Sequence, residues 1–223
     1  MDEYLSERQQ IEQLRGVVRE NAPWAVSGVL IGVGLLVGWQ QWQGWRERQG
    51  QAAGALYNQS LEALARGDRE AAAKLVGQLQ QGLRRTPYVD LGQLALARYN
   101  AENDHLADAE HALEDVMLHT KDESLALVAR LRLARVQRAE GKPDAALATL
   151  AAAPAGAAAP AFAEVRGDIL QDKGDRDGAR AAYAEALAST TTGIPNRERL
   201  ELELAALGGP PPPAAAPSSG SKP

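Results

Sequence analysis

The sequence predicts an all-α protein in which one apolar helix near the N-terminus is followed by a stack of helical hairpins. Three observations lead to this fold class. The chain of 223 residues is rich in Ala, Leu, Glu and Arg, all of which favour helix. No charged side chain occurs from Asn21 through Trp45. Beyond this stretch, turn signals of one kind recur at intervals of 33 to 37 residues.

The uncharged stretch, residues 21–45, is predicted to be a transmembrane anchor. The 18 residues from Ala22 to Trp39 are almost entirely apolar or small, and a helix of that length is about 27 Å long, close to the hydrocarbon thickness of a bilayer. Tryptophans flank the run, as interfacial anchors do: Trp24, Trp39, Trp42 and Trp45. A buried core helix is the alternative. A cleaved signal peptide fits less well, because the bulky exit offers no small-residue cleavage site.

The arginines around the anchor bear on its direction. Three precede it and two follow it: Arg8, Arg15 and Arg19, then Arg46 and Arg48. Positively charged residues concentrate on the cytoplasmic side, so the count favours a cytoplasmic N-terminus by three to two. Residues 1–20 form a short amphipathic head, which the Asn-Ala-Pro sequence ending at Pro23 is expected to interrupt. The head lies on the membrane, pairs with a partner or is simply solvated.

Within the anchor, Gly28 with Gly32 and Gly34 with Gly38 form two pairs of small residues four apart, on different faces of the helix. Such pairs let another helix approach closely, which makes these four glycines candidates for transmembrane packing. The frequency of glycine in membrane helices is an equally good explanation.

Residues 46–207 are predicted to form about four helical hairpins. Each hairpin contains a turn signal, at Gly67-Asp68, Asn103-Asp104, Gly141 to Asp144, and Gly174-Asp175. Glycine adopts the left-handed conformation that closes one helix, and aspartate caps the next. Thr86-Pro87 is predicted to be a cap followed by proline in the first turn of another helix.

Aligned on Gly67, Asp104, Gly141 and Gly174, the hairpins share a pattern of residue sizes. Seven residues before the turn a small residue recurs: Ser60, Ala97, Ala134 and Gly167. The residue five after the turn is always alanine: Ala72, Ala109, Ala146 and Ala179. Two further positions are expected to fill the space between hairpins: Val76, Leu113, Leu150 and Tyr183, then Leu79, Val116, Ala153 and Ala186. Small residues at both crossing positions let two helices pack closely.

This pattern resembles the tetratricopeptide repeat, an α-solenoid motif with a period of about 34 residues. The last copy matches best, through Gly167, Leu170, Gly174, Ala179, Tyr183 and Ala186. The first three copies lack the motif's leading Trp, its helix A Tyr and its closing Pro. Coincidental matches among abundant alanines are the alternative. Residues 194–207 are predicted to be a helix that caps the array, and the Pro- and Ala-rich residues 208–223 to be disordered.

Composition and motifs exclude most kinds of chemistry. The chain has no cysteine, which rules out disulfides and thiol catalysis, and its net charge of −5 argues against nucleic acid as a partner. His105, His111 and His119 are spaced by six and eight residues, which is not the spacing of a helical metal site. Neither a phosphate-binding loop nor a nucleophile elbow occurs. The sequence predicts no catalytic residue, no metal site and no cofactor, and therefore a protein that is not an enzyme.

Charge patterning marks a candidate interaction surface. Residues 102–123 contain eight acidic side chains against one lysine, and the next predicted helix carries Arg130, Arg132, Arg135 and Arg138. One interpretation is ion pairing between helices along a solvated face. The other is a bipolar binding surface, with six candidate residues: Asp108, Glu114, Asp115, Arg130, Arg135 and Arg138.

Over residues 1 to about 207, the order of parts resembles the YfgM family, the ancillary subunit of the bacterial SecYEG translocon. The resemblance lies in the Tyr4 to Leu14 head, the single span flanked by Trp, and the array opening with Ala53 to Leu64. It implies an inner-membrane protein with a cytoplasmic N-terminus and a periplasmic array. It also implies association with SecYEG and with the membrane-anchored chaperone PpiD, in support of exported client proteins. Restraint of a cytoplasmic stress-response regulator is attributed to the family as well.

The expectation is thus a single-pass adaptor, held by membrane lipid, whose array binds other proteins. Two alternatives fit the same sequence. One is an envelope-assembly scaffold of the same topology without a translocon link. The other is a stress-response regulator whose array faces the cytoplasm.

Overall fold

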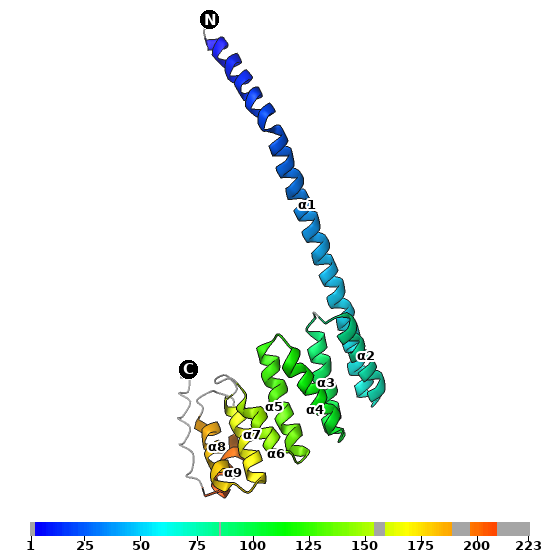
Figure 1. Cartoon of the computed structure of the whole chain (residues 1–223), viewed down its shortest axis with the longest axis vertical. Helices are drawn as coiled ribbons and strands as arrows, with labels where there is room; N and C mark the ends of the chain where they lie inside the picture. The colour runs from blue at the N-terminus through cyan, green and yellow to red at the C-terminus, as the bar shows by residue number, and fades with distance from the viewer. Residues whose placement is uncertain (1–2, 85, 154–158, 189–196, 209–223) are drawn as a thin grey trace, which may run out of the picture. The chain divides into compact units, whose positions relative to one another are not determined.

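The structure, a computed structural model, describes residues 3–84, 86–153, 159–188 and 197–208, with the backbone alone at 3–23, 25, 26, 29 and 159. It divides into two units, Met1–Gly54 and Ala55–Pro223. All regular secondary structure in the described ranges is helical, which confirms the all-α prediction (Figure 1). The helices are α1 (Glu3–Ala65), α2 (Arg69–Gly82), α3 (Tyr88–Glu102), α4 (Leu106–His119), α5 (Glu123–Ala139), α6 (Pro143–Ala151), α7 (Ala159–Asp172), α8 (Arg176–Ala188) and α9 (Arg197–Ala206).

Helix α1 supplies all the helical structure of the first unit. It continues through Pro23, so the predicted interruption there is wrong. The fixed φ of proline is itself helical, and a long helix tolerates the loss of one hydrogen bond. Among the described residues, no helix combines the length and hydropathy that crossing a membrane requires. The side chains of the predicted head, and several in the first part of the predicted anchor, lie outside the described residues.

In the second unit, the end of α1 pairs with α2, α3 with α4, α5 with α6, and α7 with α8. The four turns within these pairs have the same backbone conformation. Gly67, Asp104, Gly141 and Gly174 have φ of 78°, 60°, 73° and 79°. In each turn, the N–H of the following residue donates to the carbonyl oxygen five residues earlier, at 2.8 to 2.9 Å. This closes the first helix and satisfies its last carbonyls, and it confirms the predicted alignment of the turns.

Caps at the start of the second helices follow the prediction only in part. Asp68 and Asp175 accept hydrogen bonds from Ala71 N and Gly178 N, as helix caps do. Asp104 instead takes the left-handed position itself, since aspartate tolerates positive φ better than most residues. Asp144 lies in the first turn of α6, after Lys142.

The connection from α2 to α3 also departs from the prediction. The Thr86 hydroxyl donates to the Leu83 carbonyl at 2.9 Å, so it does not cap α3. Pro87 precedes the first residue of α3 with a helical φ of −66°.

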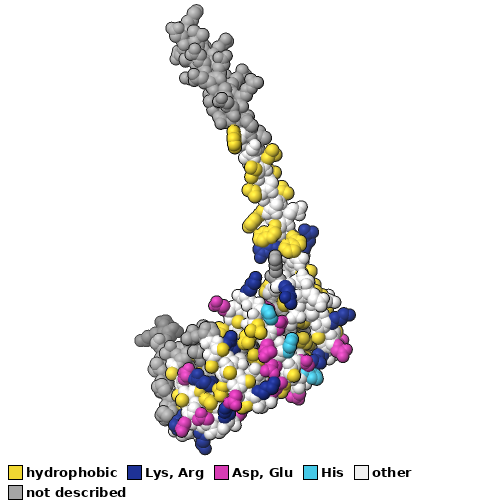
Figure 2. All heavy atoms as spheres, in the orientation of Figure 1, with side chains coloured by type: hydrophobic (Ala, Val, Ile, Leu, Met, Phe, Trp, Pro, Cys, Tyr) yellow, Lys and Arg dark blue, Asp and Glu magenta, His cyan; other side chains and the backbone are white. Residues whose placement is uncertain are grey.

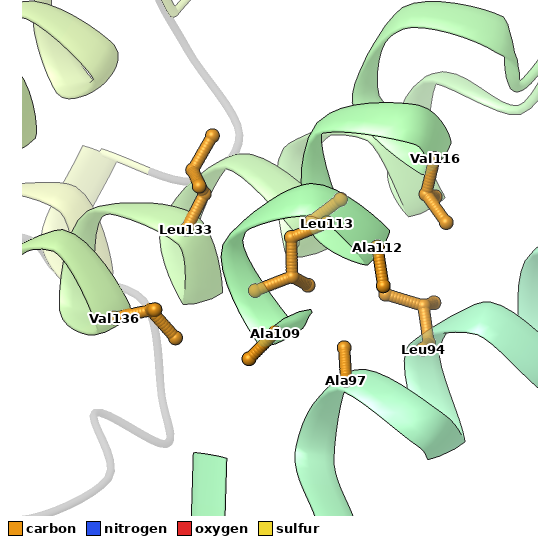
Figure 3. Packing of buried hydrophobic residues seen from close by; sticks show 9 residues of the cluster. Leu94, Ala97, Ala109, Ala112, Leu113, Val116, Leu133 and Val136 are labelled. Carbon is orange, nitrogen blue, oxygen red and sulfur yellow. The ribbon is translucent and has the colours of Figure 1, made fainter. Parts of the chain in front are cut away.

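The small positions on both sides of the turns are buried in all four hairpins. Seven of the eight residues in the two rows are at most 1% exposed: Ser60, Ala97, Ala134, Ala72, Ala109, Ala146 and Ala179. The eighth, Gly167, is also buried. Figure 3 shows this packing at the middle of the array, where Ala97 of α3, Leu113 of α4, and Leu133 and Val136 of α5 belong to one buried cluster. Ala153 differs from the expected filling residues, because α6 ends at Ala151 and leaves it half-buried.

Helix α9 covers the last hairpin. Its Leu200 and Leu204 are buried against α7 and α8, in one cluster with Tyr183. Leu202, on the other side of α9, is 72% exposed. The packing confirms a capping helix, and the tail predicted to be disordered lies outside the described residues except for Gly208.

Candidate interaction site

The acidic candidates on α4 contact the preceding hairpin. Asp108 pairs with Arg69 of α2, whose Nε donates at 2.8 Å to Oδ1 of the buried Asn100. Asp115 accepts from Gln80 at 2.8 Å and from Gln93 at 3.3 Å. These bonds join α4 to α2 and α3. Glu114 is half-buried and has no ion pair among the described residues.

The basic candidates on α5 separate into two groups. Arg138 reaches the following hairpin, where its Nη1 lies 3.2 Å from Oδ2 of Asp168 and its Nε 2.5 Å from Oδ2 of Asp172. The hydrogen bond from Arg138 lowers the pKa of Asp172 below its ordinary value. Arg130 is half-buried, and Arg135 is exposed. In the described part of the chain, no ion pair joins the α4 acids to these three arginines.

Asp168 of α7 is the centre of a polar cluster that the sequence did not indicate. Besides Arg138, its carboxylate lies 3.3 Å from Nη1 of Arg199 on α9 and 2.9 Å from the hydroxyl of Tyr183 on α8. Burial of Tyr183, together with the nearby Asp168 charge, raises the pKa of the phenol. Arg199 also pairs with the buried Glu164. Four helices thus meet at one carboxylate, which gives this cluster a structural role.

A groove lies between α3 and α5. Its volume is about 420 Å³, within the usual range of ligand pockets, about 300 to 1,000 Å³. The lining residues come from three helices: Ala97, Arg98, Ala101 and Glu102 of α3, Leu113 of α4, and Arg132, Arg135 and Val136 of α5. The floor is apolar, and Figure 3 shows three of its residues, Ala97, Leu113 and Val136, close together. The rim is charged.

Of the six predicted surface residues, only Arg135 lines this groove. Arg132 belongs to the arginine run that the charge pattern marks, whereas Arg98 and the apolar floor were not predicted from the sequence. A usable signal was present, because Arg98 and Arg135 both stand six residues before their turns, immediately after the small crossing residue. That position carries an exposed residue in both hairpins.

The predicted transmembrane packing residues lie on open helix surface. A Cβ added at Gly28, Gly32, Gly34 or Gly38 would meet nothing within 4 Å. Large apolar side chains between them are also exposed, among them Leu35 and Leu36 at 70% each, and Figure 2 shows hydrophobic side chains along this stretch. Farther along, Arg46 lies over the Trp42 ring at 4.7 Å.

Comparisons with known proteins agree with the architecture. A sequence model described as a tetratricopeptide repeat-like domain matches residues 18–209. A protein of Escherichia coli K12 is 32% identical over 195 residues, covering 86% of this chain and 92% of the relative. One from Haemophilus influenzae is 29% identical, covering 83% and 90%, and one from Aggregatibacter actinomycetemcomitans is 31% identical, covering 82% and 89%. Each of the three is named an ancillary SecYEG translocon subunit.

Proposed function

The chain belongs to the tetratricopeptide repeat-like family of ancillary SecYEG translocon subunits, and on that premise we propose that it is a non-enzymatic adaptor at the translocon. The observation that carries the proposal is the extent of the likeness. It covers about nine-tenths of each named relative, and the family match begins at residue 18, so it includes the predicted anchor as well as the array.

The proposal includes an inner-membrane anchor at residues 21–45. Support comes from the absence of charge across this stretch and from the described side chains, of which Leu30, Ile31 and Leu35 are 65 to 70% exposed. A helix with large apolar side chains directed away from the protein needs apolar surroundings. The arginine count around the anchor and the family resemblance give the direction in this proposal: the N-terminus is cytoplasmic and the array periplasmic.

The array, in this proposal, binds partner proteins by contact. Stacked hairpins provide extended surfaces suited to polypeptide segments, and the groove between α3 and α5 is one such surface. Exported clients and the chaperone PpiD are the partners that the family resemblance implies. An envelope scaffold without a translocon link would bind other partners through the same surfaces.

Two measurements on the full-length chain test the proposal. A reporter that is active only in the periplasm, fused after Gly208, should be active, whereas the same reporter fused ahead of Met1 should be inactive. SecYEG should co-purify with the chain from detergent-solubilised membranes. The reverse reporter pattern would overturn the topology. Crosslinks from the array to envelope-assembly proteins, without SecYEG recovery, would overturn the translocon assignment in favour of the scaffold.

A further inference from the structure

One face of α1 changes from aliphatic to aromatic to cationic along its length. Leu35, Trp39, Trp42 and Arg46 follow one another at the i, i+4 and i, i+3 spacings that place side chains on one side of a helix. The first three are 70%, 58% and 46% exposed. Figure 2 shows that Lys and Arg side chains follow the hydrophobic side chains of this helix. These four residues are called the graded face below.

The aromatic part of the graded face positions its cation. The ring centroids of Trp39 and Trp42 are 5.3 Å apart, and Cζ of Arg46 lies 4.7 Å from the centroid of the Trp42 ring. An indole attracts a cation placed over its face, so the guanidinium is held back along the helix, toward the predicted anchor at residues 21–45. Arg46 forms no ion pair in the described part of the chain, and its N–H groups can therefore bind an external anion.

Arg48 offers an internal comparison on the other side of the same helix. Its Nε donates a hydrogen bond to the Gly44 carbonyl oxygen at 3.0 Å. Like Arg46, it is exposed and has no ion pair among the described residues. The residues four and seven positions before it are Gly44 and Gln41, whereas tryptophans hold both positions before Arg46. The two arginines thus carry the same charge at nearly the same level of α1 but continue faces of different chemistry.

We propose that the graded face binds a single anionic phospholipid, with Arg46 at the headgroup phosphate and Leu35 against an acyl chain. The inference rests on the proposed function, since it requires that the anchor lie in a membrane. A phospholipid presents the same order of chemistry as this face: hydrocarbon, then the interfacial region that indoles favour, then a phosphate. A guanidinium donates two parallel hydrogen bonds to a phosphate. Because the net charge of the chain is −5, a local cation and not the charge of the whole molecule attracts the anionic lipid.

The test measures the lipid that the full chain binds in detergent. The chain is mixed with equal amounts of phosphatidylglycerol and phosphatidylcholine that carry the same acyl chains, and native mass spectrometry counts the bound molecules of each. The unchanged chain should bind phosphatidylglycerol about tenfold more tightly than phosphatidylcholine. Arg46→Gln should lose this preference, and Trp42→Leu should reduce it, because the guanidinium is no longer held over a ring. Glycerol phosphate, which has the anion without acyl chains, should not displace the lipid.

Arg48→Gln is the matched control, because it removes the same charge from the same part of α1. This variant should keep the preference for phosphatidylglycerol. Loss of the preference in both arginine variants would mean attraction by charge alone and would overturn the proposal. Equal binding of the two lipids by the unchanged chain, full preference in Arg46→Gln, or displacement of the lipid by glycerol phosphate would also overturn it.

Flotation of the chain with phosphatidylglycerol vesicles, together with recovery of SecYEG, separates this inference from the proposed function. If the chain floats with the vesicles but does not distinguish the two lipids, only the lipid site fails. If the lipids are distinguished but SecYEG is not recovered, the lipid site holds and the translocon role fails. If the chain does not float, the anchor fails and the lipid site fails with it.

Discussion

Gly167 of α7 lies directly against the ring of Tyr183 on α8. A Cβ added at Gly167 would be 2.5 Å from Cε1 of Tyr183, closer than packed atoms come. The two residues occupy the register positions held by Ala97 and Leu113 in the second hairpin. The size of one residue in the pair therefore limits the size of the other.

Replacing Gly167 by Ala should lower the free energy of unfolding by about 1 to 3 kcal/mol, the usual cost of overpacking. Adding Tyr183→Leu should recreate the alanine and leucine pair of the second hairpin, so the double variant should be more stable than the sum of the two single changes predicts. Denaturant unfolding measures all three. Gly77→Ala is the control, because nothing lies within 4 Å of its added Cβ. If the double variant's change in the free energy of unfolding equals the sum of the two single changes, the pairing of Gly167 with Tyr183 is contradicted.

Asp168→Asn should destabilise the end of the array. Its carboxylate holds Arg138, Arg199 and Tyr183 together, and hydrogen bonds to charged groups contribute about 1.5 to 3 kcal/mol. Thermal unfolding should show a lower midpoint. Asp177→Asn provides the control, since that side chain is 86% exposed and its ion pair among the described residues is with Arg180 of the same helix. Equal effects of the two changes would show that the cluster contributes little.

Stability should fall in acid through Glu110. Hydrogen bonds from Lys142 and Gln137 lower the pKa of this carboxyl below its ordinary value of 4.5. A group whose pKa is depressed by folding contributes stability above its unfolded pKa, and that contribution is lost as the pH falls through the folded value. The melting midpoint should therefore decline below about pH 4.5. The Glu110→Gln variant should have a lower melting midpoint at neutral pH, and that midpoint should decline less steeply as the pH falls. Parallel curves of melting midpoint against pH for the two proteins would contradict the assignment to Glu110.

Bulky residues in place of two anchor glycines should reduce association with SecYEG. Gly28→Ile with Gly32→Ile keeps the helix apolar but blocks close approach of another helix to that face. SecYEG recovery from solubilised membranes should fall several-fold. The control pair, Leu30→Ile and Leu36→Ile, changes shape without adding bulk. Undiminished recovery in the glycine variant would show that this face does not contact the translocon.

Much of the array could be predicted because local rules determine it. A left-handed residue ends a helix wherever the chain turns back, so Gly67, Gly141 and Gly174 mark their turns in the sequence, and aspartate replaces glycine at position 104. Crossing helices require small residues at a constant distance from those turns. Pro23 is the exception: a proline predicts a break, yet α1 continues through it, because the fixed φ of proline is itself helical.

The candidate site was less predictable. Charge patterning placed Asp108 and Arg138 on one surface, whereas Asp108 pairs with Arg69 and Arg138 with Asp172, in the hairpins on either side. Long side chains pair with whichever charge the stacking brings near, and the sequence contains no periodicity for such contacts. The groove escaped prediction for the same reason, since its floor combines residues from α3, α4 and α5.

The amino-acid sequence alone determined the helical hairpins, their register and the family. The residues that form each turn, and the small residues where the two helices of a hairpin cross, act within a single repeat. Only the tertiary structure decided which charges are paired, which carboxylate joins four helices, and which arginines at the groove have no ion pair among the described residues. These outcomes depend on distances between side chains of different hairpins, and stacking alone sets those distances.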